Sequence, residues 1–178
     1  MGLIRAFISI DIPENLLKEI EKVQKKLPCF EGKLTEPKNL HLTLKFLGEI
    51  DEEKIVEVKR RLREIKYGKF EAKISEIGFF PSSYIKILWV KLDNCQNIQR
   101  IIDEKLECIF KKEEKFMSHV TIARVKYVKN KKYFLEELKK TEIPDGLKFK
   151  VKSFELKKSI LKKTGPIYET IEEYELEQ

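Results

Sequence analysis

Apolar residues recur along this chain with two periods, and the two periods predict different elements. Alternation of apolar and polar positions, in segments rich in β-branched residues, is typical of strands. Such segments span residues 3–11, 40–47, 70–80, 85–92, 118–126, 147–161 and 167–176. Apolar residues three or four positions apart are typical of helices. They span residues 13–27, 51–65, 94–109 and 131–140.

Prolines and short polar residues mark the ends of these segments. Pro13 stands at the first position of the first predicted helix, and Pro28 ends that helix. Asp51 begins the second helix, and Asn94 is expected to cap the third. The polar residues 29–39 are predicted to form a loop that leads into the second strand.

The order of the predicted elements is an approximate duplication. Strand, helix, strand and helix are followed by a hairpin that turns at residues 81–83, and a second hairpin turns at residues 165–166. We therefore predict an α+β fold with two pseudo-symmetric lobes, each an antiparallel sheet with packed helices, around a central cleft. No low-complexity linker divides the 178 residues, so residues 1–178 are expected to form one domain of two lobes.

The chain contains two histidines, and each opens the same pattern of histidine, aliphatic residue, threonine and aliphatic residue. The two copies begin at His41 and at His119, within predicted strands. Side chains alternate faces along a strand, so His41 shares a face with Thr43, and His119 with Thr121. If the two strands face one cleft, that cleft holds two imidazoles and two hydroxyls.

These groups suit displacement at a phosphorus atom. One imidazole can accept a proton while the other donates one, because histidine titrates near neutral pH. Threonine hydroxyls such as those of Thr43 and Thr121 can donate hydrogen bonds to phosphate oxygens that gain charge. In-line displacement places the attacking and leaving oxygens on opposite sides of the phosphorus. The acid and the base should therefore face each other across the cleft.

The motifs resemble those of the two-histidine (2H) phosphoesterase superfamily, and within it the RNA 2′,3′-cyclic phosphodiesterases, also called 2′-5′ RNA ligases. The marks of that family are two His-x-Thr-x motifs, which read HLTLKFLGE and SHVTIAR in this chain. Further stretches that resemble the family are RAFISIDIP, GFFP, ILWVKL and KKTGPIYE. The resemblance extends over nearly the whole chain.

The resemblance implies a reaction and a set of roles. The reaction is hydrolysis of an RNA 2′,3′-cyclic phosphate end to a 2′-phosphate without a metal or other cofactor, with 2′-5′ ligation as its reverse. It implies that His41 donates a proton to the leaving 3′ oxygen, that His119 accepts one from water, and that Arg124 binds substrate. Strict alternation places Arg124 on the face opposite His119, so a bulge or the strand's end must re-aim it. Family members commonly have proline before the second histidine, where this chain has Ser118.

Other residues are weaker candidates for the cleft. Lys45 shares the predicted face of His41 and would bind substrate through its positive charge; a solvated lysine is the alternative. Aromatic residues can stack on a base, although in strands they more often belong to the core; the candidates are Phe46, Phe79, Phe80, Tyr84 and Trp89. Candidates for trailing RNA phosphates are Lys157, Lys158, Lys162 and Lys163.

Composition adds expectations about partners and compartment. A net charge of +7 is compatible with RNA as a partner, although charged residues also cover any solvated surface. The three cysteines form no Cys-x-x-Cys pair, and no acidic residue repeats with the motifs, so neither a disulfide framework nor a metal site is expected. No apolar run has the length of a membrane span and no targeting signal is recognised. We expect a monomeric, cytoplasmic protein without membrane association.

Two other functions are compatible with the sequence. One is a non-catalytic module that binds RNA ends or nucleotides, and the other is a 2H enzyme acting on a small cyclic nucleotide or on 2′-5′ oligoadenylate. A binding module has no need of two proton-transfer groups, so the two intact motifs favour catalysis.

Overall fold

The protein is described by a computed structural model that covers residues 2–81, 83–162 and 165–178. Its helices are α1 (Glu14–Lys25), α2 (Glu52–Leu62), α3 (Gln96–Lys105) and α4 (Lys131–Lys139), with a 3₁₀ turn at Pro37–Asn39. Its strands are β1 (Ile4–Asp11), β2 (Glu31–Leu34), β3 (His41–Ile50), β4 (Phe70–Phe80), β5 (Ile87–Asp93), β6 (His119–Tyr127), β7 (Lys148–Val151), β8 (Ser153–Lys162) and β9 (Gly165–Glu175). The predicted α+β class is confirmed.

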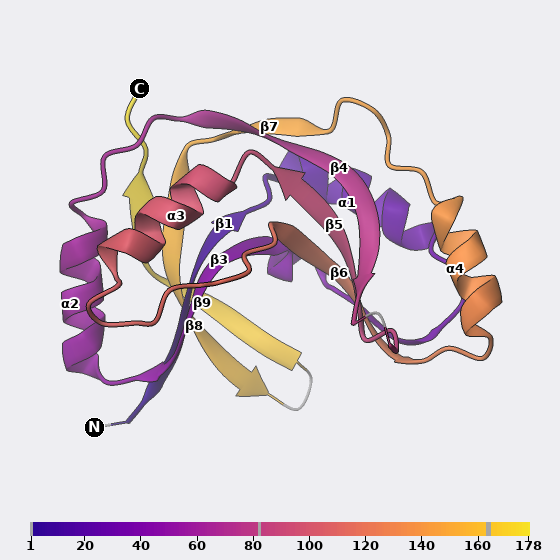
Figure 1. The fold of residues 1–178 in the computed structure, drawn as a ribbon, viewed down its shortest axis with the longest axis horizontal. Helices are drawn as coiled ribbons and strands as arrows, with labels where there is room; N and C mark the ends of the chain where they lie inside the picture. The colour runs from indigo at the N-terminus through magenta and orange to yellow at the C-terminus, as the bar shows by residue number, and fades with distance from the viewer. Residues whose placement is uncertain (1, 82, 163–164) are drawn as a thin grey trace.

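The described strands form a single curled antiparallel sheet. Its order is β7-β4-β5-β6-β3-β1-β8-β9, with β2 paired to β6 (Figure 1). The order is symmetric about its centre: counted outward from the centre, β3, β1, β8 and β9 on one side correspond to β6, β5, β4 and β7 on the other. The sheets of the two predicted lobes are therefore continuous, and they join at the centre where Leu42 of β3 lies opposite Val120 of β6. A pseudo-twofold axis passes through this pair.

The helices are exchanged between the two halves. Helix α1, which lies between β1 and β3 in sequence, packs on β6, where Gln24 Nε2 donates to the Ile122 carbonyl at 2.8 Å. Helix α3, which lies between β5 and β6, packs on β3. Figure 1 shows α2 and α3 together at one end of the molecule and α1 and α4 at the other. Each end therefore combines one helix from each half of the sequence.

The predicted N-cap of α2 is confirmed, and that of α3 is not. The carboxylate of Asp51 accepts a hydrogen bond from the Lys54 amide at 2.8 Å and caps α2, as the sequence predicts. Asn94 does not cap α3, which is a correction: it has φ of 71° and its side chain donates to the Glu71 carbonyl at 3.0 Å. Cys95 takes the N-cap position, and α3 ends at Lys105 rather than at residue 109.

The strands differ from the prediction in three main respects, besides shifts of one or two residues at other ends. The predicted loop 29–39 contains β2, whose four residues are all exposed and therefore show no apolar alternation. The predicted strand 147–161 is divided into β7, which pairs with β4, and β8, which pairs with β1. Strand β3 continues beyond Gly48, which has φ of 74°, to Ile50. Of the predicted turn 81–83, Ser82 lies outside the described residues.

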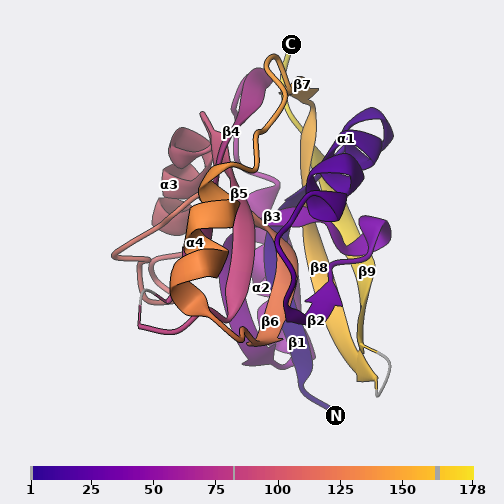
Figure 2. The ribbon, with the colours of Figure 1, turned by 90° about the vertical axis from the view of Figure 1, so that its right-hand side faces the viewer.

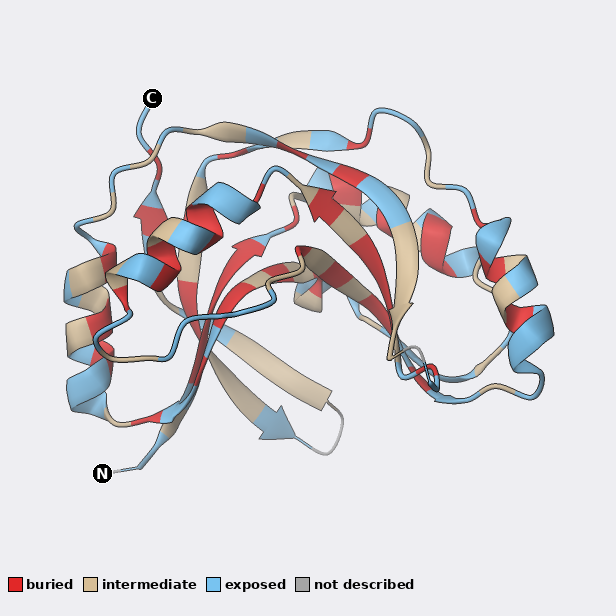
Figure 3. Cartoon of the chain, in the orientation of Figure 1, coloured by how far each residue is buried: buried red, intermediate tan, exposed pale blue. Residues whose placement is uncertain are grey.

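The core lies beneath the two central strands. Leu42, Val120 and Ile122 are fully buried on the face of the sheet opposite the histidines. Figure 3 shows buried residues along the central strands and on the inward faces of the helices, while the end of the β8–β9 hairpin is half-buried or exposed. Figure 2 shows that hairpin standing beside β1 at one edge of the sheet. Among the described residues, no helix has the length and apolar character that crossing a membrane requires.

Candidate active site

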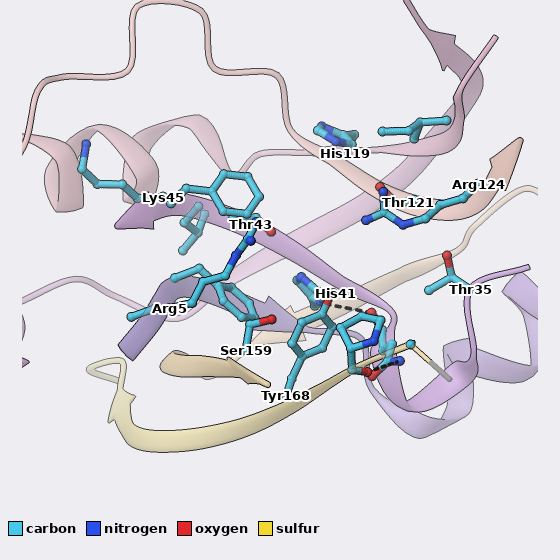
Figure 4. Close-up of a pocket in the computed structure, with 18 of the residues that line it drawn as sticks. Arg5, Thr35, His41, Thr43, Lys45, His119, Thr121, Arg124, Ser159 and Tyr168 are labelled. Carbon is cyan, nitrogen blue, oxygen red and sulfur yellow. Dashed lines mark hydrogen bonds between the residues drawn. The ribbon is translucent and has the colours of Figure 1, made fainter. Parts of the chain in front are cut away.

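A cleft of about 1130 Å³ lies over the junction of β3 and β6. Both motif histidines and both motif threonines line it, together with Arg124 (Figure 4). The sixth predicted site residue, Lys45, also borders the cleft, but its side chain points away from the two histidines.

The antiparallel register explains how the two motifs meet. With Leu42 opposite Val120, the neighbouring residues place His41 toward Thr121 and Thr43 toward His119. Each imidazole therefore has the hydroxyl of the other motif beside it. The two imidazoles line the same cleft, one from each half of the chain.

Main-chain carbonyls fix the tautomers of both histidines. Nδ1 of His41 lies 2.8 Å from the Asn39 carbonyl oxygen, and Nδ1 of His119 lies 2.7 Å from the Met117 carbonyl oxygen. A carbonyl oxygen only accepts, so each Nδ1 must carry the proton and donate it. In both rings Nε2 is left as the nitrogen that can exchange a proton with a ligand.

Aromatic rings hold the two imidazoles in place. Tyr168 contacts His41 edge to face with ring centroids 5.0 Å apart, and Phe7 lies 5.1 Å from the same imidazole. Phe80 contacts His119 edge to face at 5.1 Å, and Trp89 lies 6.4 Å away. Carbonyl and aromatic contacts together restrict ring rotation, so the site is preorganised.

The environment of His41 disfavours its charged form. Burial is the largest cause and lowers the pKa of His41 below its usual 6.5, while the hydrogen bond to Asn39 and the carboxylate of Asp11 act in the opposite direction. The positive charges of Lys157 and Arg124 lower the pKa of His41 further. A bound anion would offset these effects.

A β-bulge in β6 places Arg124 in the cleft. Ala123 pairs with Leu88 and Thr121 with Trp89, so Ile122 is an extra residue on β6. The bulge shifts the alternation by one position. Ile122 and Ala123 are both buried and Arg124 turns to the face of His119 and Thr121. Alternation alone predicts the wrong face for this arginine.

The equivalent bulge in β3 removes Lys45 from the cleft face, which corrects the prediction for this residue. Ser9 pairs with Thr43 and Ile8 with Lys45, so Leu44 is the extra residue and Lys45 is buried. Its ammonium forms an ion pair with Asp103, with side chains 3% and 7% exposed, and donates to the Lys111 carbonyl at 2.9 Å. The positive charge of Lys45 therefore compensates the buried carboxylate of Asp103.

Comparison with known proteins agrees with this geometry. The sequence profile of the family described as "LigT like Phosphoesterase" matches residues 10–89 and 91–168, and each stretch contains one histidine motif. The chain belongs to the LigT-like phosphoesterase family. A protein of Methanocaldococcus jannaschii named RNA 2′,3′-cyclic phosphodiesterase is 42% identical over 174 residues, covering 96% of this chain and 99% of that one. One with the same name from Archaeoglobus fulgidus is 32% identical, with 96% and 99% covered.

Solved structures show the same fold. The structure of a Thermus thermophilus protein, TT0787, has a TM-score of 0.81 and 25% identity, covering 96% of this chain and 97% of that one. The structure of E. coli LigT complexed with phosphate has a TM-score of 0.80 at 20% identity and covers both chains fully. The arrangement of this LigT-like phosphoesterase is thus that of its family.

Ser118 replaces the proline that is common before the second histidine, and the backbone is held by other means. Its hydroxyl donates to the Leu92 carbonyl, and the Leu92 amide donates to the Ser118 carbonyl at 3.2 Å. Ser118 is buried and tied to the end of β5. The start of β6 is therefore fixed without a proline.

Two of the five candidate aromatic residues line the cleft of this LigT-like phosphoesterase. Phe46, which is 70% exposed, stands at the position of β3 that corresponds to Arg124 on β6, and Phe80 supports His119. Trp89 is buried beside Phe80. Phe79 lies in a separate groove beside α4, and Tyr84 lies under the Lys86 ammonium outside the cleft.

The candidate lysines of the hairpin are less available than predicted. Lys157 is buried and forms ion pairs with Asp11 and Glu155, and Lys158 pairs with Glu169 at 2.8 Å. Lys162 is exposed, and Lys163 lies outside the described residues. Two of the four candidates are thus held in ion pairs.

No group of three or more histidine, cysteine and acidic side chains is placed to hold a metal ion within the described part of the chain.

Two residues of the cleft wall, Arg5 and Tyr168, are absent from the sequence-based candidates. Arg5 and Tyr168 lie in the stretches RAFISIDIP and KKTGPIYE, which resemble the family. That resemblance is the sequence signal that could have identified them.

Proposed function

We propose that this LigT-like phosphoesterase hydrolyses RNA 2′,3′-cyclic phosphate ends to 2′-phosphate ends by two-histidine acid and base catalysis, without a metal ion. The observation that carries the proposal is the pair of imidazoles on equivalent strands, each with Nδ1–H held by a carbonyl and Nε2 free. The names of its relatives, RNA 2′,3′-cyclic phosphodiesterase, support the choice of substrate.

The proposed step is an in-line displacement with one proton transfer at each end. Water attacks the phosphorus while Nε2 of His119 takes its proton, so the new P–O bond forms on that side. The bond between phosphorus and the 3′ oxygen breaks on the opposite side, and Nε2 of His41 protonates the leaving oxygen. The product carries a 2′-phosphate and a 3′-hydroxyl.

The lowered pKa of His41 fits the role of an acid. A proton donor with a lower pKa transfers its proton more readily in the transition state, provided that it is protonated when substrate is bound. The negative charge of the bound cyclic phosphate favours the protonated imidazole and raises its pKa in the complex. Asp11 acts in the same direction.

Thr43, Thr121 and Arg124 are assigned to the phosphate oxygens. The two hydroxyls flank the space between the imidazoles and donate hydrogen bonds to the oxygens that gain charge. The guanidinium of Arg124 can bind two oxygens at once through its planar fork. These groups account for orientation of the phosphate, and the imidazoles account for proton transfer.

The reverse reaction would use the same groups. A 5′-hydroxyl attacks the cyclic phosphate in place of water, and the product is a 2′-5′ linkage. Water is present at far higher concentration than any RNA end, so we expect hydrolysis to dominate. A gel that separates joined from unjoined RNA measures the ratio directly.

The decisive assay uses RNA that ends in a 2′,3′-cyclic phosphate. The protein is incubated with this RNA in the presence of EDTA, and the position of the product phosphate is determined. We expect a 2′-phosphate. A 3′-phosphate would overturn the bond assignment, and loss of turnover with EDTA that a divalent ion restores would overturn the metal-free mechanism. Binding without turnover would favour the non-catalytic module, and turnover of small cyclic nucleotides alone would favour the other 2H activity.

The two proton roles can be separated with an activated substrate. A nitrophenyl phosphodiester has a leaving group that needs no protonation, so the donor becomes dispensable while the acceptor does not. His41→Ala should regain much of its lost rate on this substrate, and His119→Ala should stay slow. Recovery by His119→Ala instead would exchange the roles.

A further inference from the structure

We propose that Arg5 binds the 5′-phosphate of the terminal nucleotide, which is the phosphate that joins the cyclic end to the rest of the RNA. This inference rests on the proposed function, and it makes a polynucleotide end, rather than a lone cyclic nucleoside phosphate, the preferred substrate. Arg5 lies on β1, is exposed and lines the cleft. Figure 4 shows its side chain reaching toward Thr43 from the side opposite Arg124.

The assigned roles of the histidines determine where the RNA chain lies. His41 protonates the leaving 3′ oxygen, so the ribose lies on the His41 side of the phosphorus. The 5′ carbon of that ribose, and the chain attached to it, then extend along the wall formed by β3, β1 and the β8–β9 hairpin. Strand β1 lies between β3 and β8 in the sheet, and Arg5 belongs to this wall.

Arg5 starts from a position on β1 well beyond the level of the two histidines. The register partner of His41 is Asp11, and a strand rises about 3.3 Å per residue, so the Cα of Arg5 lies about 20 Å along β1 from the level of His41. The level of Thr43 is closer, because Thr43 pairs with Ser9, and the Arg5 side chain is directed toward it. Arg124 is the arginine assigned to the reacting phosphate, so we assign Arg5 to the phosphate one nucleoside away on the β1 side.

The charge of Arg5 is available to a ligand. Among the described residues that line the cleft, the cationic side chains besides Arg124 are Arg5, Lys33, Lys38, Lys45 and Lys115, and of these only Arg5 lies on β1. Lys38 pairs with Glu36 at 2.9 Å, and Lys45 is buried against Asp103. Arg5 has no ion pair within the described part of the chain. Its register partner Glu49 also lines the cleft, yet the two side chains form no ion pair.

The size of the cleft agrees with this interpretation. Pockets for single drug-sized molecules hold about 300–1,000 Å³, and a mononucleotide belongs to that class. The cleft measures about 1130 Å³. It has room for more than the ring phosphate and one nucleoside, and Arg5 is among its lining residues.

The test compares two substrates that differ by one phosphate. These are a nucleoside 2′,3′-cyclic phosphate with a free 5′-hydroxyl and the same nucleotide with a 5′-phosphate, each assayed with wild type, Arg5→Ala and Arg5→Lys. For wild type we expect kcat/KM about tenfold higher with the 5′-phosphate, the size of one charge-assisted hydrogen bond. In Arg5→Ala this ratio should fall to about one, and Arg5→Lys should keep part of it.

A matched control separates this effect from a general loss of charge. Arg100 is an exposed arginine of α3, paired with Glu104 and absent from the cleft lining, so Arg100→Ala should keep the wild-type ratio. The salt dependence of oligonucleotide binding should also decrease by about one counterion in Arg5→Ala and remain unchanged in Arg100→Ala.

Three outcomes would overturn the inference. A wild-type ratio near one would mean that no 5′-phosphate site exists. An equal loss on both substrates in Arg5→Ala would place Arg5 at the reacting phosphate, and a ratio unaffected by Arg5→Ala would assign the site to another residue. Failure of the proposed function is distinguishable from all three, because wild type would then convert neither substrate.

Discussion

Replacement of Lys45 by methionine should destabilise this protein strongly and leave substrate binding intact. Methionine keeps the length of the side chain and removes the ammonium. Asp103 would then remain buried, with a side chain 7% exposed, and among the described residues would keep only the Glu113 amide as a partner at 2.7 Å. Removing one partner of a buried ion pair costs about 3–5 kcal/mol, because the other charge stays buried and uncompensated.

The expected loss is a large part of the total stability. Domains are stable by about 5–15 kcal/mol, and in a chain of this size each kcal/mol moves the melting temperature by about 2–4 °C. Lys45→Met should therefore melt about 6–20 °C below wild type. Lys105→Met is the matched control, because Lys105 pairs with Glu64 at 2.8 Å with side chains 33% and 46% exposed. An exposed pair contributes about 1 kcal/mol or less.

The double variant Lys45→Met/Asp103→Leu tests the cause. It removes both buried charges, so most of the lost stability should return. Thermal or urea unfolding of the four proteins gives the free energies, and KM for the cyclic-phosphate RNA is measured well below the lowest melting temperature. A Lys45→Met variant as stable as wild type, with a raised KM, would refute the buried pair and return Lys45 to the substrate.

Three further predictions concern the site. Because burial lowers the pKa of His41 and kcat/KM reports the free enzyme, the pH profile should have an inflection below the unperturbed value of about 6.5; a profile with every inflection above that value would contradict the role of burial. Arg124→Ala should weaken binding of a cyclic-phosphate end by about 10- to 100-fold, measured by titration, and more than His41→Ala does; equal affinities for Arg124→Ala and wild type would place this guanidinium outside the cleft. Gly78→Ala would place a Cβ 2.2 Å from the Trp89 ring, which lies beside His119; we expect about 1–3 kcal/mol of destabilisation and slower turnover, and unchanged melting and rate would show that the ring can move freely.

The sequence predicts elements well where one face is buried. Strand β4 has its predicted bounds, and the buried faces of α1 and α2 follow the predicted period. Strand β2 was missed because edge pairing with β6 requires no apolar side chain. The division between β7 and β8 falls at Lys152, where no turn residue interrupts the alternation. The boundary is set by strand pairing, because β7 pairs with β4 and β8 pairs with β1.

The candidate site shows the limit of alternation as a rule. Up to the threonine of each motif, the faces follow the period of two, and both histidines lie where the pattern places them. Beyond it, a bulge in each strand reverses the faces, so Arg124 enters the cleft and Lys45 leaves it. A bulge depends on the pairing of two strands, and one strand's sequence does not reveal it. A one-residue shift in the alternation therefore explains why the predicted faces of Arg124 and Lys45 were both wrong.

The exchange of helices between the halves has a consequence for how the molecule is assembled. Each half extends a helical arm onto the strand of the other, and this is the geometry of a domain-swapped dimer whose two subunits have been joined into one chain. A half expressed alone would leave the apolar face of its arm without a partner and would carry a single imidazole. A cut between α2 and β4 leaves β8 and β9, which extend the sheet from β1, on the fragment that carries His119. The two fragments should associate as an obligate heterodimer, and catalytic competence should appear only with that association.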